Sequence, residues 1–128
     1  VGPNPHGPEF GTVEMVIHDS ADTDLLFAGM QCRQSVQTSH FQSVLDLPPG
    51  AVCLASTDQD PHHAFAIGRL AWGVQFHPEY RVDVARAYIH QSADTLAARG
   101  LVANQLIRSV TDTPVARSLL RRFADIVS

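Results

Sequence analysis

The chain has 128 residues, of which 45% are hydrophobic and 17% are charged, and its formal net charge is −4. This length and composition are typical of one globular domain, and the lack of a basic cluster argues against a nucleic-acid surface. No apolar run reaches the roughly 18 residues of a membrane span, and the first residues lack the pattern of a signal peptide. We therefore expect a cytoplasmic protein with neither a membrane nor a nucleic acid as partner.

The first half of the chain has the composition of a loop followed by strands. Residues 1–11 contain three prolines and three glycines, which predicts an opening loop. Residues 20–29 predict a short apolar turn that ends at Gly29. Around Gly68 the connection is short enough for a hairpin. Strand-like composition is found at 12–18, 33–40, 51–56, 63–68 and 71–76.

The two cysteines, Cys32 and Cys53, lie in this part of the chain. They show neither CxxC spacing nor the density of a disulfide scaffold. We predict that both are reduced thiols and that Cys53 is buried within a strand.

Beyond residue 80 the apolar residues recur at helical spacing. Two such series are Ala85, Ile89, Ala93, Leu96 and Val115, Leu119, Phe123, Ile126. Thr113 and Pro114 form a good N-cap and first-turn pair for the last helix, and a further short helix is expected near residues 106–110. A strand-rich part, 12–80, therefore precedes a helical tail, 81–128, an order that by itself favours an α+β domain.

The stretch GVQFHPEY, residues 73–80, ends a hydrophobic strand with a base and an acid two positions apart. In an extended chain His77 and Glu79 project to the same side, and Pro78 favours an extended conformation for the residue before it. A carboxylate beside an imidazole fixes one tautomer and stabilises the imidazolium, as in catalytic triads. The pair therefore predicts two triad members that lack a nucleophile.

A chance pair and a metal site are the alternatives to a triad at these residues. An H-x-E tripeptide often occurs by chance, and a surface pair of this kind usually has no function. A metal site could gather His62, His63, His77 and Glu79, but no recognised zinc spacing is present. The adjacent histidines of QDPHHAF fit a solvated turn more simply. We therefore expect no metal and no cofactor.

The sequence around the tripeptide resembles one enzyme family. AWGVQFHPEY is similar to the segment of class I glutamine amidotransferases, W-G-V-Q-F-H-P-E, that carries the triad His and Glu. SHFQSVLDLPPGAVCLAST resembles the family's stretch with a Leu-Pro-x-Gly turn and a Leu-Ala-Ser strand. PNPHGPEFGTVEM and DTDLLFAG resemble the branch nearest the glutaminase part of guanosine monophosphate synthetase. The resemblance covers about residues 3–80 and is weaker in the helical tail.

For this family the resemblance implies an open α/β sheet with flavodoxin-like winding and a Cys-His-Glu triad. The cysteine attacks the side-chain amide of glutamine to give a thioester and ammonia, and water completes the hydrolysis. By this match His77 is the base and Glu79 its orienting carboxylate, while Ser39 and His40 line the glutamine site.

The family's nucleophile has no match in the chain. Neither Cys32 nor Cys53 has the flanking glycines of the G-x-C-x-G elbow, and both lie after the point in the family order where the elbow belongs. Residues 1–128 therefore resemble the C-terminal half of one amidotransferase domain. We expect the parent protein to be an enzyme and this chain alone to be inactive. Sheet edges should be uncovered and should require the N-terminal half or a second copy.

The resemblance leaves the final reaction open. Ammonia would pass to a separate synthetase, or the same triad would hydrolyse a γ-glutamyl amide other than glutamine. A third possibility is a binding or regulatory module that has lost catalysis, although an intact His77 and Glu79 argue against a long-standing loss.

Overall fold

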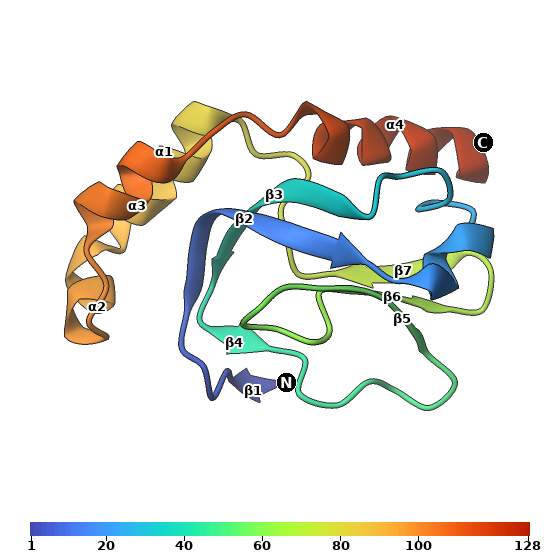
Figure 1. The fold of residues 1–128 in the computed structure, drawn as a ribbon, viewed down its shortest axis with the longest axis horizontal. Helices are drawn as coiled ribbons and strands as arrows, with labels where there is room; N and C mark the ends of the chain where they lie inside the picture. Colours follow the sequence, from blue (N-terminus) through green and yellow to red (C-terminus); the bar gives the residue numbers. More distant parts are fainter.

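A computed structural model describes residues 1–128, which form seven short strands, a 3-10 turn and four helices (Figure 1). The strands are β1 (Gly2–Pro3), β2 (Glu9–Ile17), β3 (Arg33–His40), β4 (Gln42–Ser43), β5 (Val52–Ser56), β6 (Ala64–Ile67) and β7 (Ala71–Val74). The 3-10 helix η1 (Asp19–Thr23) follows β2, and the helices are α1 (Val82–Gln91), α2 (Ala93–Ala98), α3 (Ala103–Ser109) and α4 (Pro114–Val127). None of these helices has both the length and the apolar composition that crossing a membrane requires.

The main sheet has five antiparallel strands in the order β3-β2-β5-β6-β7, and β1 pairs with β4 in a separate ribbon. It is strongly curled, because β2 pairs with β3 over almost its whole length but with β5 only at Val16 and Ile17. The chain leaving β7 then runs between the two ends of the sheet. There the N–H of Gln75 donates to the carbonyl of His63, and the N–H of His77 donates to that of Gln37.

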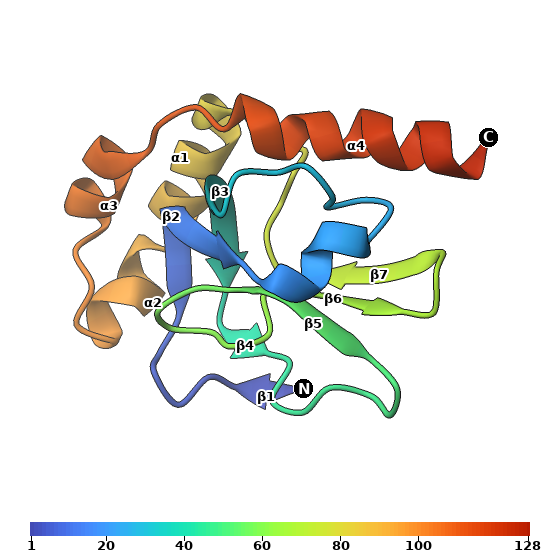
Figure 2. The same ribbon diagram turned by 45° about the vertical axis from the view of Figure 1, so that its right-hand side comes forward.

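Helices cover this sheet in two groups. α4 lies across one face of the sheet, whereas α1, α2 and α3 gather at one end of the molecule (Figures 1 and 2). Two cores correspond to these groups: the larger contains Met15, Phe27 and Leu119, and the smaller contains Phe10 and Ile89.

β2 contributes to both cores because it bends at Gly11. This residue has φ +93°, a conformation that glycine adopts readily and other residues rarely. A Cβ at this position would make an ordinary contact with Ile89 of α1 at 3.6 Å, so the backbone conformation and not the available space favours glycine. The bend therefore lets a single strand pack against both groups of helices.

Most predicted elements are confirmed, since each predicted strand overlaps an observed one and β6 and β7 form the expected hairpin. The mixed α/β class with strands first and helices last is also confirmed. The predicted opening loop, residues 1–11, was too long, because β2 begins at Glu9 and pairs there with His40.

The predicted cap of the last helix is only partly confirmed. Thr113 occupies the N-cap position of α4, but its side chain makes no capping hydrogen bond. The Thr113 hydroxyl is buried without any partner. The expectation for Cys53 was also too strong, since this residue lies in β5 but is only half-buried.

Candidate active site

His77 and Glu79 are in direct contact at the surface. Nδ1 of His77 lies 2.7 Å from Oε1 of Glu79, with the two side chains 34% and 53% exposed. Since the carboxylate only accepts, Nδ1–H donates to it, and the neutral ring keeps its lone pair on Nε2. No group of the chain hydrogen-bonds this Nε2. The pair thus holds an imidazole whose basic nitrogen is available to an external proton donor.

The route by which the two side chains meet differs from the extended chain that the sequence suggested. Residues 77–80 form a tight turn closed by the Tyr80 N–H, which donates to the carbonyl of His77 at 3.2 Å. The strand itself ends earlier, at Val74. Pro78 at the second position of the turn fits its fixed φ. A turn therefore brings the acid back beside the base.

Aromatic stacking fixes the plane of the imidazole. The rings of His77 and Tyr80 are nearly parallel with centroids 4.1 Å apart, and Tyr80 stacks in turn on Tyr88 of α1 at 5.2 Å. Burial, followed by the neighbouring Tyr88, raises the pKa of Tyr80 to about 12, against the opposing contact of the Ser39 hydroxyl. Tyr80 therefore stays a neutral phenol, and it packs the histidine against the smaller core.

The residues that precede the His77–Glu79 pair, called the dyad below, hold it in position. Trp72 donates its indole N–H to Asp24 at 2.9 Å, which ties β7 to the segment after η1. Gln75 donates to the carboxylate of Asp60 at 2.9 Å and accepts from the N–H of Val44 at 3.2 Å. Their side chains are thus occupied in holding β7 and the turn in place.

Gly73 has a steric role in the same stretch. It pairs with Phe65 across the β6–β7 hairpin, and the Phe65 ring lies over it so closely that any Cβ would overlap the ring. This contact explains why the strand that leads to the dyad carries a glycine.

Ser39 and His40, which sequence similarity placed near the glutamine site, lie at the end of β3. The Ser39 side chain is close enough to Tyr80 to oppose the rise in its pKa, and Tyr80 in turn stacks on His77. His40 instead points to Glu9, with Nε2 3.0 Å from Oε1, while its Nδ1 donates to the carbonyl of Gln42 at 2.7 Å. Both ring nitrogens of His40 are therefore engaged within the protein.

Glu9 is a buried acid that the sequence analysis overlooked. Burial alone would raise its pKa, but hydrogen bonds from His40 and His63 and the charge of His63 outweigh it and lower the pKa to about 2. Burial likewise opposes charge on His40, yet the contacts with Glu9 and the Gln42 carbonyl raise the pKa of that imidazole. β2 was predicted to start after Glu9, which left this acid in a loop.

The prediction of a solvated turn for the two adjacent histidines was wrong for His63. This side chain has no exposed surface, and its Nε2 donates to Glu9 at 2.8 Å. The turn exposes the neighbouring Pro61, but it leads directly into β6, whose first residues enter the core. His77 and Glu79 do not join a metal-ligand cluster with these histidines.

Comparisons with known proteins support the relationship suggested by the motif. A GMP synthase (glutamine-hydrolysing) of Porphyromonas gingivalis is 38% identical over 72 residues, which are 56% of this chain and 14% of that protein. A GMP synthase (glutamine-hydrolysing) of Staphylococcus carnosus is 34% identical over 92 residues, 67% of this chain and 17% of that protein. No protein-family model matches the chain.

The fold is also shared with solved amidotransferase structures. A glutamine amidotransferase from Thermotoga maritima superimposes with a TM-score of 0.74 at 22% identity, covering 98% of this chain and 53% of that one. The chain thus spans about half the length of that structure and less than a fifth of the GMP synthases. Over the part that aligns, the chain is related to the class I glutamine amidotransferases.

Proposed function

We propose that the protein is a glutamine amidotransferase, in which His77 and Glu79 are two members of a Cys-His-Glu triad that releases ammonia from glutamine. The observation that carries this proposal is the 2.7 Å contact between Nδ1 and the Glu79 carboxylate, which leaves Nε2 free at the surface. A GMP synthase named as glutamine-hydrolysing is 38% identical to 72 residues of this chain, which supports the proposal. A cytoplasmic location is in keeping with this proposal.

In this mechanism Nε2 of His77 accepts the thiol proton as the cysteine attacks the amide carbon of glutamine. The carboxylate of Glu79 stabilises the resulting imidazolium. The same Nε2 then gives the proton to the departing nitrogen, which leaves as ammonia, and water hydrolyses the thioester. A separate synthetase would consume the ammonia. Ser39, beside Tyr80, and His40 remain candidates for the wall of the glutamine site.

The nucleophile is proposed to come from outside residues 1–128. Neither cysteine sulfur hydrogen-bonds His77, and Sγ of Cys53 faces the carbonyl of Pro61 at 3.2 Å. Burial raises the pKa of Cys53, which disfavours the reactive thiolate. This chain alone is therefore expected to be inactive toward glutamine.

An apolar groove beside the dyad is the proposed seat of the missing segment. It lies between α4 and β7 and is lined by Leu26, Trp72, Val74, Phe76, Pro78 and Phe123. β7 pairs only with β6, so its other edge is open, and Val74 and Phe123 are 39% and 43% exposed. Because Pro78 separates His77 from Glu79, a segment seated there would arrive next to the triad histidine. The additional length of the solved structure provides such a segment.

The test is a glutaminase assay of the complete amidotransferase domain that contains this chain. His77→Gln should lower kcat by roughly 10²- to 10⁴-fold, because the general base is lost. His90→Gln, an exposed change on α1, is the matched control and should keep full activity. Full activity of His77→Gln would refute the triad. Faster turnover of γ-glutamyl conjugates than of glutamine would redirect the proposal to an amide hydrolase.

A second measurement addresses the groove. Residues 1–128 should associate with a separately produced nucleophile-bearing segment, and Val74→Asp should weaken that association at least tenfold. If Val74→Asp instead dissociates a homodimer of residues 1–128 and leaves binding of the segment unchanged, the groove is a self-association surface.

A further inference from the structure

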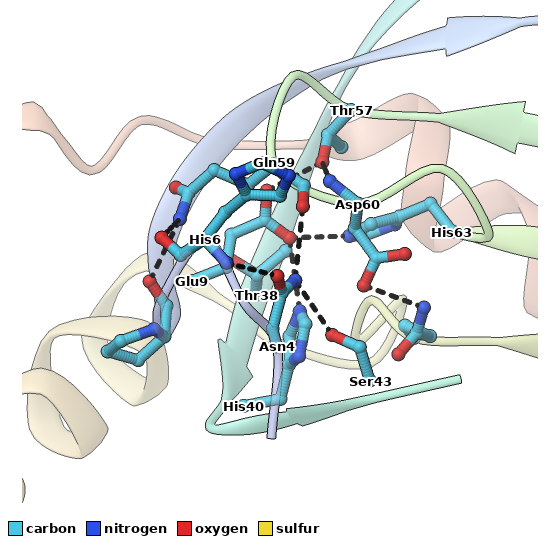
Figure 3. Close-up of polar contacts among 12 residues, drawn as sticks. Asn4, His6, Glu9, Thr38, His40, Ser43, Thr57, Gln59, Asp60 and His63 are labelled. Carbon is cyan, nitrogen blue, oxygen red and sulfur yellow. Dashed lines mark hydrogen bonds and ion pairs between the residues drawn. The ribbon is translucent and has the colours of Figure 1, made fainter. Parts of the chain in front are cut away.

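Away from the dyad, three potential metal ligands converge on one point inside the curled sheet. Nε2 of His40 and Nε2 of His63 lie 3.0 Å and 2.8 Å from Oε1 of Glu9, and the three atoms all lie within 4.8 Å of one another. The ligands come from β3, from the turn before β6 and from the start of β2. Figure 3 shows both imidazoles aimed at the Glu9 carboxylate. None of these side chains takes part in the proposed triad.

Two of the three side chains, His40 and Glu9, are held by a second hydrogen bond, as metal ligands commonly are. The Nδ1–H of His40 donates to the carbonyl of Gln42, and Oε2 of Glu9 accepts from the Thr57 hydroxyl at 2.7 Å. The Nδ1 of His63 is buried without a hydrogen-bond partner, so this ring is oriented only by stacking on Phe76, with the planes 4° apart. All three donors are therefore oriented before any ion arrives.

The spacing and charge of the cluster suit a small divalent ion. Around a tetrahedral Zn²⁺ with bonds near 2.0 Å, ligand atoms lie about 3.3 Å apart, so the Glu9 oxygen must move back by about 0.5 Å. The two imidazole nitrogens, which lie within 4.8 Å of each other, must also come to that spacing. The buried carboxylate of Asp60, hydrogen-bonded to Gln75 close by, adds negative charge. The His40 side chain is 13% exposed, against 2% for Glu9 and 0% for His63, so an ion and a fourth, water ligand would enter from the His40 side.

We propose that Glu9, His40 and His63 form a binding site for a first-row divalent transition-metal ion, with Zn²⁺ as the best fit. Two imidazoles and one carboxylate are the donor set that Zn²⁺ accepts, whereas Ca²⁺ and Mg²⁺ require mostly oxygen ligands. Binding replaces the Nε2 protons of both histidines, which are released to solvent. The ion would connect β2, β3 and the turn before β6 behind Phe76, the residue that precedes His77. This site goes beyond the proposed amidotransferase function and does not depend on it. With the ion bound, His40 would serve as a metal ligand and not as part of the glutamine-site wall.

The expectation from sequence that no metal binds rested on a different set of residues. It weighed His62, His63, His77 and Glu79, of which only His63 belongs to the cluster. Glu9 and His40 are 54 and 23 positions away from His63, so only the fold brings them together.

The experiment is a titration of the purified, chelator-treated protein with Zn²⁺, followed by calorimetry, and with Co²⁺, followed by its visible absorption. A mildly alkaline buffer is used because coordination releases protons. We expect one ion per chain, a higher melting temperature in its presence and a tetrahedral Co²⁺ spectrum. Less than a fifth of an equivalent, or an octahedral spectrum, would overturn the site.

Matched variants separate this site from surface histidines. His40→Gln changes the partly exposed ligand and should weaken Zn²⁺ binding more than tenfold, and Thr57→Val, which removes only the support of Glu9, should weaken it about tenfold. His90→Gln and His77→Gln should bind as the unchanged protein does. Circular dichroism in chelator checks that each variant is folded. Unchanged affinity in folded His40→Gln, or loss of binding in His77→Gln, contradicts the proposal.

Discussion

Two histidine–glutamate contacts of nearly equal length lie in this protein in opposite surroundings. The His77–Glu79 contact is 2.7 Å long with the side chains 34% and 53% exposed, whereas Glu9 meets His63 at 2.8 Å with 2% and 0% exposed. An exposed pair contributes little to stability but keeps a nitrogen free to react. A buried pair cannot lose one partner without leaving the other uncompensated. The exposed His77–Glu79 pair is thus suited to proton transfer. The buried Glu9–His63 pair is suited to stabilising the fold or to binding an ion.

The largest expected effect is on the exposed pair. In the complete amidotransferase domain, Glu79→Gln should lower kcat for glutamine roughly 10²-fold or more, because the amide neither stabilises the imidazolium nor fixes the tautomer. Its free energy of unfolding should change by less than about 0.5 kcal/mol. Steady-state kinetics and urea unfolding check the two values. Asp83→Asn, an exposed acid in α1, is the control, and equal kinetics in both variants would remove Glu79 from the triad.

The buried acid should show the reverse behaviour. Glu9→Gln, measured with chelator present, should lower the free energy of unfolding by about 3 kcal/mol, because an amide cannot accept from both histidines and Thr57. Urea unfolding of Glu9→Gln and Glu79→Gln side by side checks the contrast. Equal losses in the two variants would erase the distinction between the pairs.

A smaller effect is expected in the strand that leads to the dyad. Gly73→Ala places a methyl group where the Phe65 ring lies, and the overlap should cost about 1–3 kcal/mol of stability. Thermal unfolding measures this loss, with Ala71→Thr at an exposed position of β7 as control. Adding Phe65→Ala should remove the overlap, so non-additive losses in the double variant are expected. Additive losses would show that Phe65 is not the obstacle.

The smallest effect concerns pH. The pKa of Tyr80 is raised from 10.0 to about 12, since its ionised form is disfavoured in the fold. The stability that this group contributes is full below pH 10 and is lost as the pH rises through 12. The loss is at most about 3 kcal/mol for a two-unit shift. The free energy of unfolding, measured at several alkaline pH values, should therefore fall less steeply with pH in Tyr80→Phe than in the unchanged protein. Identical profiles would show that Tyr80 titrates normally.

Local patterns predicted the part of the site that is local. His77 and Glu79 are two residues apart, so one turn suffices to join them, and their contact could be predicted from the tripeptide. The helices could be predicted equally well, because the sequence itself shows the 3.6-residue period of α1 and α4 and the Thr113–Pro114 boundary. The turn geometry at 77–80 and the unpaired Thr113 hydroxyl could not be predicted from the sequence, since both depend on neighbouring elements.

By itself, then, the sequence determined the order of strands and helices, the family relationship and the dyad, because each depends on residues close together in the chain. Only the tertiary structure decided where Glu9, His40 and His63 lie. The bend at Gly11 and the curl of β2 across β3 and β5 fold residues more than 50 positions apart onto one carboxylate oxygen. Burial then makes that contact unlike the one at the surface, since removing charges from water makes an unpaired partner costly.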